Sequence, residues 1–146
     1  MSRILVIASE FNRGISEGLW LGCQRVLKEQ NCAHEITWVP GAFELPVAAA
    51  NGAKSGHFSA IICLGAVIRG ETAHFDFVAG ECAAGLMQVN TQTGVPTLFG
   101  VLTTNTVQQA MARSSDDSNN KGAEVATAAL KTLQALKEID EMGSRS

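Results

Sequence analysis

The sequence is short of charged residues, which make up 17% of its 146 positions, against about 25% in ordinary soluble domains. Its formal net charge is -3, and it has none of the basic stripes that bind nucleic acid. A small domain with few charges often has a further apolar face to cover. The composition therefore argues against nucleic acid as a partner and points toward a homo-oligomer.

Long hydrophobic runs are also missing. No run reaches the roughly 18 apolar residues that mark a membrane helix. The chain opens with Met1-Ser2-Arg3 and an apolar run over 4–7, which is too short for a secretory signal peptide and has no small-residue cleavage site after it. We therefore expect a cytoplasmic protein with no membrane partner.

Metal-binding and disulfide patterns are absent as well. The four cysteines are Cys23, Cys32, Cys63 and Cys82. None forms a CxxC pair, and none has metal-ligand spacing with a histidine. We expect four reduced thiols that mostly fill the core, and no metal site.

What the sequence does have is an apolar pattern that switches between short continuous runs and helical spacing, over a length that suits one domain, 1–146. Continuous runs predict buried strands at 3–8, 34–39, 58–67 and 97–102. Helical spacing predicts helices from Asn12 or Ser16 to about 30, over 43–54, over about 75–89, over 106–112 and over 121–138, the last with Val125, Ala129, Leu133 and Leu136 facing inward. We expect a polar loop without a core residue at 114–120 and a frayed tail from 141.

Strands that alternate with helices predict a parallel sheet with crossover helices on both faces. The expected fold is an α/β, flavodoxin-like, three-layer α/β/α sandwich, with a four-stranded parallel sheet in the order 2-1-3-4. Such sheets bind ligands outside the carboxyl ends of their strands. The residues that follow each strand are therefore the candidate site.

Two such segments follow the first and second strands. Phe11 has nothing local to bury it, so it is either a stacking platform for a flat heteroaromatic ring or a packing or oligomer contact. Pro40-Gly41 predicts a tight turn that directs the next helix toward the same edge. Glu44 is either an acceptor for a polar ligand or a favourable partner of the helix dipole.

The segment after the third strand, 65–74, is the densest. Its glycines, Thr72 and helix start suit an anion bound on backbone amides, although the GxxxxGK[ST] phosphate loop is absent. His74 is either a proton carrier, the usual task of histidine at neutral pH, or a helix-capping residue. Arg69 suits an ion pair or a subunit contact.

Beyond the fourth strand, Arg113 begins a polar loop and Lys121 opens the last helix. We expect Asp116 and Asp117 to be the only local acid partners for these two cations. They are either a phosphate clamp, to which arginine contributes a planar fork, or a solvated loop pair.

Five segments together resemble the lumazine synthase family over nearly the whole chain: FNRGIS at 11–16, WVPGAFELP at 38–46, GAVIRGETAHFDFV at 65–78, GVPTLFGVLTT at 94–104 and NKGAEVATAAL at 120–130. The resemblance implies a transferase of riboflavin biosynthesis. It would condense 5-amino-6-(D-ribitylamino)uracil with 3,4-dihydroxy-2-butanone 4-phosphate to give 6,7-dimethyl-8-ribityllumazine. No redox step occurs in that reaction, so no cofactor or metal is expected.

The resemblance also implies a role for each matching position. His74 would transfer protons, Phe11 would stack on the pyrimidine, and Arg113 would bind the phosphate. The ring and ribityl chain would be held by Ala42, Phe43, Glu44, Ala66, Val67 and Ile68, the phosphate group would lie at Glu71 and Thr72, and Phe99 and Lys121 would complete the pocket. That pocket would lie between adjacent subunits of a pentamer, or of a multiple of pentamers. Phe99 would come from one chain and the other groups, Arg113 and Lys121 included, from its neighbour.

The chain departs from the family pattern in three places. Glu10 stands where many relatives have a basic residue, and the loop after Arg113 carries Asp116 and Asp117 where relatives tend to have Gly, Thr and Lys. Glu71 stands where a small residue is common, beside the expected phosphate. Backbone amides, rather than this side chain, would then bind the anion.

Several alternatives stay open to test. A receiver domain needs clustered acids after the first strand, and a flavodoxin needs a Ser/Thr/Gly-rich loop there, whereas this chain has Glu10-Phe11-Asn12. Two further alternatives come from relatives of similar fold. One is a structural shell protein without turnover, and the other is an enzyme that makes riboflavin from two lumazines. Assays with both substrates, and with lumazine alone, separate these two from a lumazine synthase.

Overall fold

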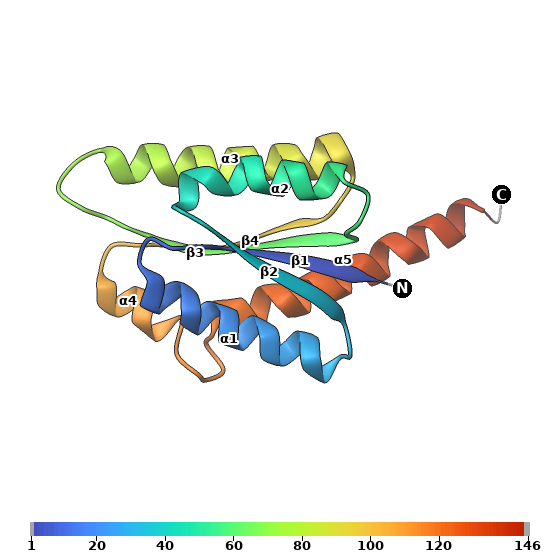
Figure 1. Ribbon diagram of the computed structural model, residues 1–146, viewed down its shortest axis with the longest axis horizontal. Coiled ribbons are helices and arrows are strands. Elements are labelled where there is room, and N and C mark those ends of the chain that lie inside the picture. Colours follow the sequence, from blue (N-terminus) through green and yellow to red (C-terminus); the bar gives the residue numbers. More distant parts are fainter. Residues whose placement is uncertain (1, 145–146) are drawn as a thin grey trace.

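The computed structural model of the chain describes residues 2–144, which form one sheet between two layers of helices (Figure 1). The elements are β1 (Arg3–Ser9), α1 (Arg13–Glu29), β2 (Ala33–Val39), the 3-10 turn η1 (Ala42–Glu44), α2 (Leu45–Lys54), β3 (Ala60–Ile68), α3 (His74–Thr93), β4 (Thr97–Thr104), α4 (Val107–Ala112) and α5 (Lys121–Gly143). All strand pairs are parallel, and the order is β2-β1-β3-β4. The predicted fold class and strand order are confirmed.

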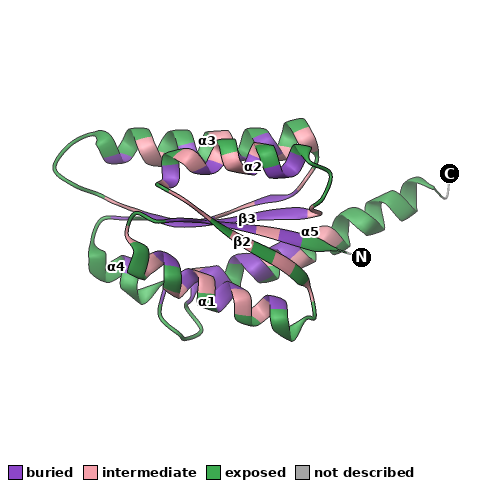
Figure 2. Ribbon diagram, viewed as in Figure 1, coloured by how far each residue is buried: buried purple, intermediate pink, exposed green. Residues whose placement is uncertain are grey.

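The two faces of the sheet are covered by different helices. In Figure 1, α2 and α3 lie on one face, and α1, α4 and α5 lie on the other. The central strand β3 is buried from Ala60 to Ala66 (purple in Figure 2), because both of its faces are covered. Each face has its own apolar cluster, one around Ile62 and Leu19 and the other around Ile61 and Leu86.

Two details of the last third of the chain correct the sequence analysis. The loop 114–120 was expected to hold no core residue, but Ser114 and Asn120 are both buried. Leu136 was expected to face inward, but it is 37% exposed. The helix α5 runs on to Gly143, and its last turns project beyond the sheet, so that no layer remains for Leu136 to pack against (Figures 1 and 2).

The expected frayed tail from 141 is also partly wrong. Positions 141–143 belong to α5, and positions 145 and 146 lie outside the described residues. No helix formed by residues 2–144 is both long and apolar enough to span a membrane. Within the same residues, no group of three or more His, Cys, Asp or Glu side chains is placed to hold a metal ion.

The four cysteines are free thiols. Cys23, Cys63 and Cys82 are fully buried in the two apolar clusters, as expected of core fillers, and Cys32 is half-buried. Burial raises the pKa of the Cys23 thiol to about 12 and that of Cys82 to about 11. It also raises the pKa of Cys63 far above the ordinary range. These three thiols therefore stay protonated, and unreactive, at neutral pH.

Candidate active site

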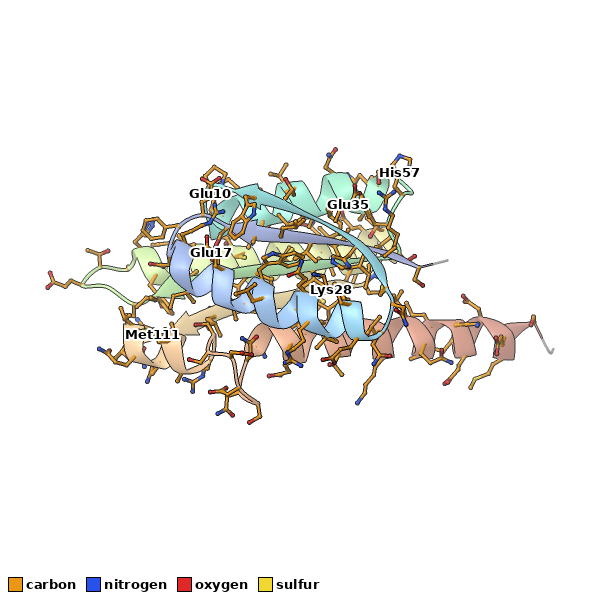
Figure 3. All side chains as sticks on the ribbon, turned by 60° about the horizontal axis from the view of Figure 1, so that its bottom comes forward. Glu10, Glu17, Lys28, Glu35, His57 and Met111 are labelled. Carbon is orange, nitrogen blue, oxygen red and sulfur yellow. The ribbon has the colours of Figure 1, made fainter. Side chains whose placement is uncertain are left out.

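The carboxyl ends of the four parallel strands meet at one end of the sheet. Glu10 and Met111 lie at this end, and His57 lies at the opposite end (Figure 3). A hollow of about 820 Å³ opens here. Among the expected site residues it is lined by Phe11, Ala42, Phe43, Glu44, Ala66, Val67, Ile68, Thr72 and His74. We call it the ring hollow, because of the aromatic side chain at its mouth.

Phe11 stands at the mouth of the ring hollow with 72% of its surface exposed. Its backbone N–H donates to the carbonyl oxygen of Pro40 at 3.0 Å. The next residue, Asn12, is left-handed with φ 59° and occupies the N-cap position before α1. Instead of capping that helix, its side-chain amide donates to the carbonyl oxygen of Ala66 at 3.1 Å. The loops after β1, β2 and β3 are thus joined around Phe11.

The loop after β2 forms the floor of the ring hollow. The N–H of Glu44 donates to the carbonyl oxygen of Gly41 at 3.2 Å, which closes the turn η1. Pro46 then stands in the first turn of α2, where a missing N–H costs nothing. This turn leaves Phe43 59% exposed and brings Glu44 to the hollow as a hydrogen-bond acceptor.

The loop from β3 to α3 is held by Arg69. Its guanidinium contacts Asp76 at 3.5 Å, donates to Asn105 Oδ1 at 3.0 Å and lies 4.4 Å from the centre of the Phe75 ring. The expected ion pair of Arg69 is confirmed. The residue ties the end of β3 to the first turn of α3 and to the loop after β4.

His74 is the first residue of α3, and its side chain lies at the ring hollow. Its backbone N–H, rather than its ring, donates to Thr72 Oγ1 at 3.3 Å, and Thr72 is exposed beside it. Glu71 is also exposed but does not line the hollow.

A second hollow of about 660 Å³ lies over β4 and the start of α5. It brings together Phe99, Arg113 and Lys121, and we call it the cation hollow. Arg113 Nη1 donates to the carbonyl oxygen of Gln109 at 2.9 Å, and Lys121 Nζ lies 3.1 Å from Glu124 Oε1. The partner of Lys121 is thus Glu124, not Asp116 or Asp117.

The expected grouping of these side chains is wrong for a single chain. We expected Arg113 and Lys121 to lie with Phe11 and His74, and Phe99 to come from a different chain. Instead, Phe99 shares the cation hollow with the two basic residues, and none of the three lines the ring hollow. Sequence order could not show this, because it gives the element on which a residue lies and not the hollow that its side chain enters.

The structure adds lining residues that were not among the expected pocket residues. These are Pro40, Gly41, Gly70, Phe75, Phe77 and Val78 in the ring hollow, and Ser118, Asn119 and Glu124 among others in the cation hollow. Phe77 is 70% exposed although it sits in an apolar helix. Phe77 lies two positions after the buried Phe75 and therefore on a different face of the helix. This spacing could have predicted from the sequence that Phe77 is exposed.

The chemistry of the two hollows is complementary. The ring hollow offers aromatic faces and a few polar groups, a set that suits a flat, polar heterocycle. The cation hollow offers a guanidinium and an ammonium, a pair that suits a phosphate group. Among residues 2–144, no arginine or lysine lines the ring hollow, and Phe99 is the one aromatic residue that lines the cation hollow.

Comparison with known proteins decides between the families that share this fold. A sequence profile of 6,7-dimethyl-8-ribityllumazine synthase matches residues 1–137. The chain belongs to this family. It is an enzyme of the lumazine synthase family, and neither a flavodoxin nor a receiver domain.

Two relatives show how far the similarity reaches. The chain is 46% identical, over 142 residues, to 6,7-dimethyl-8-ribityllumazine synthase 1 of Caulobacter vibrioides, covering 95% of this chain and 93% of that lumazine synthase. It is 45% identical, over 142 residues, to 6,7-dimethyl-8-ribityllumazine synthase of Edwardsiella ictaluri, covering 94% and 91%. The similarity therefore includes both hollows.

Proposed function

We propose that this enzyme condenses 5-amino-6-(D-ribitylamino)uracil with 3,4-dihydroxy-2-butanone 4-phosphate in a site built by two adjacent copies of the chain. The observation that carries this proposal is the division of the binding groups between the ring hollow and the cation hollow. The two substrates need a platform for a pyrimidine and a clamp for a phosphate. One hollow supplies each.

The two hollows of one chain meet those of its neighbours when copies pack head to tail. The ring hollow of one chain then faces the cation hollow of the next, and a contact of this heterologous kind forms a ring when the rotation between copies closes. We propose a homopentamer or a multiple of pentamers. Large exposed apolar side chains on the α2 and α3 layer support such packing: Phe43, Val47, Phe77 and Met87 are 59–71% exposed.

Each expected site residue has a role in this arrangement. Phe11 stacks on the pyrimidine, while Ala42, Phe43, Glu44, Ala66, Val67 and Ile68 hold the ring and the ribityl chain. The backbone amides at Glu71 and Thr72 face the phosphate group of the second substrate. Arg113 of the neighbouring copy binds that phosphate, and Phe99 and Lys121 of the same copy close the site.

The reaction needs orientation and proton transfer. The amine of the uracil attacks the ketone, water leaves to give an imine, phosphate is eliminated, and ring closure releases a second water. His74 accepts the proton that the attacking amine loses and returns it to the departing hydroxyl. Orientation of two reactants supplies about 7–11 kcal/mol, and a proton carrier adds roughly 10²–10⁴-fold in rate. Because no electrons pass to an outside acceptor, the chemistry requires no redox cofactor, and we propose that the chain's own residues carry it without a metal.

We place this enzyme in the cytoplasm, with small-molecule substrates and copies of itself as its partners, and without nucleic acid. The net charge of -3 and the absence of a basic stripe from the sequence argue against a nucleic-acid partner.

The direct test is to mix the two substrates with the purified enzyme and to follow the fluorescence of the lumazine product, while native mass spectrometry counts the copies. We expect product only when both substrates are present, and a multiple of five copies. Assembly without product would indicate a structural shell. Conversion of lumazine alone into riboflavin would indicate the sister reaction.

A further inference from the structure

Asn120 is a buried side-chain amide between three segments of the chain. Only 3% of the residue is exposed. Its Nδ2 donates to the carbonyl oxygen of Gly18 in α1 at 3.1 Å and to that of Ser115 at 2.9 Å. Its Oδ1 accepts from the N–H of Ala123 at 3.0 Å and so caps α5. One amide thus fastens α1, the loop 114–120 and α5 together.

The contact between α1 and this loop depends on glycine. A methyl group on Gly18 would collide with the carbonyl oxygen of Ser114, and one on Gly22 would collide with the side chain of Asn120. The backbone of α1 therefore lies directly against the backbone of Ser114 and the side chain of Asn120. Small movements of the loop are blocked on this side.

The rest of the loop offers no comparable anchor at its distal end. Its start is tied to α4, since Ser114 Oγ donates to the carbonyl oxygen of Ala110 at 3.0 Å and Ser115 Oγ to that of Met111 at 2.7 Å. The residues at 115–119 are polar and exposed and bury no apolar side chain. Asn120 is the point at which the far end of the loop meets the core.

The loop carries both cations of the cation hollow at its two ends. Arg113 precedes it, Lys121 follows Asn120 directly, and the N–H of Lys121 donates to the carbonyl oxygen of Arg113 at 2.8 Å. We propose that Asn120 is a positioning residue, whose amide fixes Arg113 and Lys121 at the spacing that grips the phosphate of the substrate. This inference rests on the proposed function of the cation hollow.

The test compares Asn120→Ser with Asn90→Ser. Serine keeps the N-cap of α5 but cannot reach Gly18 and Ser115. Asn90 is a matched control, because its amide donates to Leu86 at 3.0 Å and to Thr97 at 2.9 Å, and accepts from the Thr97 N–H at 2.7 Å. It lies 16 residues after His74 on α3, about 24 Å from the site end of that helix.

We expect Asn120→Ser to raise KM for the phosphate-bearing substrate by about 10-fold or more, with KM for the uracil within about twofold of wild type. Asn90→Ser should lower the melting temperature in a similar way and leave both KM values within about twofold. Equal KM values in the two variants would overturn the inference. So would an equal rise in KM for both substrates of Asn120→Ser, because a loosened fold would produce that result.

A second pair keeps the test decisive if Asn120→Ser fails to fold. Asn120→Asp retains the size and the helix cap but loses both donated hydrogen bonds. Because it also adds a negative charge near the phosphate, Asn119→Asp measures the effect of that charge one position away. A larger rise in phosphate-substrate KM for Asn120→Asp than for Asn119→Asp supports the inference, and an equal rise overturns it.

The proposed function fails in a different way. If the wild-type enzyme makes no lumazine from the two substrates, the function itself is wrong. If the wild type is active and the Asn120 and Asn90 variants have the same KM values, only the positioning role is wrong.

Discussion

The side-chain amide of Asn12 donates a 3.1 Å hydrogen bond to the carbonyl oxygen of Ala66, and so joins the loop that carries Phe11 to the end of β3. The backbone of Asn12 is left-handed, with φ 59°, and this conformation turns the chain from Phe11 into α1. The orientation of the Phe11 ring therefore depends on a bond made by its neighbour.

Asn12→Gly removes that amide and keeps the turn, because glycine adopts positive φ without strain. We expect KM for the uracil substrate to rise by about 10-fold through loss of ring orientation. Asn31→Gly is the matched control, since Asn31 has φ 52°, is exposed and ends α1 far from the hollow. Steady-state kinetics that show no difference between the two variants would rule out this role for Asn12.

His74→Ala should slow the enzyme without abolishing its activity. Orientation provides most of the acceleration, and a lost proton carrier costs roughly 10²-fold in kcat. Single-turnover kinetics should show the loss in the chemical step, with little change in KM. The control is His57→Ala, at the opposite end of the sheet (Figure 3). Complete inactivity of His74→Ala with an intact fold and assembly would contradict the account.

Glu71→Gln tests whether the phosphate is bound by backbone amides beside an unfavourable charge. We expect KM for the phosphate-bearing substrate to fall by about two- to fivefold at low ionic strength, because a like charge is removed. Salt near 1 M should erase the difference by screening. Glu81→Gln removes the same charge from an exposed position of α3 and serves as control. A rise in KM for Glu71→Gln would mean that the side chain itself contributes to binding.

The burial of three of the four thiols predicts which cysteines an alkylating reagent modifies. In the native protein at pH 8, iodoacetamide should modify Cys32 and spare Cys23, Cys63 and Cys82, whereas all four should react in denaturant. Intact-mass spectrometry counts the adducts. Rapid modification of all four thiols in the native protein would show that the core opens readily.

The same buried thiols should lower the free energy of unfolding at alkaline pH. Unfolded thiols ionise above about pH 8.5, while Cys82 and Cys23 stay protonated in the fold until their pKa values of about 11 and 12. The folded chain then binds more protons, so raising the pH favours unfolding by up to about 1.4 kcal/mol per pH unit for each such thiol. Urea unfolding between pH 8.5 and 10.5 measures this slope. Cys82→Ala should make it shallower, and an unchanged slope would contradict the assignment.

The sequence alone was enough for the sheet and its strand order. The continuous apolar run of β3 and the helical spacing of α3 depend only on local burial, and both were predicted correctly. Leu136 was misplaced because a helical pattern does not say where the neighbouring layer ends. Asn120 was missed because its bond partner in α1 is Gly18, which is far away in sequence and offers only a backbone carbonyl.

The division of the site into two hollows was also beyond sequence reasoning. The segments expected to form the site contain Phe11, His74, Phe99, Arg113 and Lys121. Sequence order does not say which of the two neighbouring hollows each of these side chains enters. Only the packing of β4, α4 and α5 places Phe99, Arg113 and Lys121 together.

The central claim is that each active site takes its ring hollow from one copy of the chain and its cation hollow from another. Complementation tests it most directly: chains with Phe11→Ala and His74→Ala are co-expressed with chains carrying Arg113→Ala, and the mixed assemblies are purified through two different tags. With equal numbers of the two chains arranged at random in a closed ring, about a quarter of the sites combine two intact hollows. The account predicts that mixed assemblies recover about that share of wild-type activity, far above either variant alone. Activity no higher than the average of the two separate variants would contradict it.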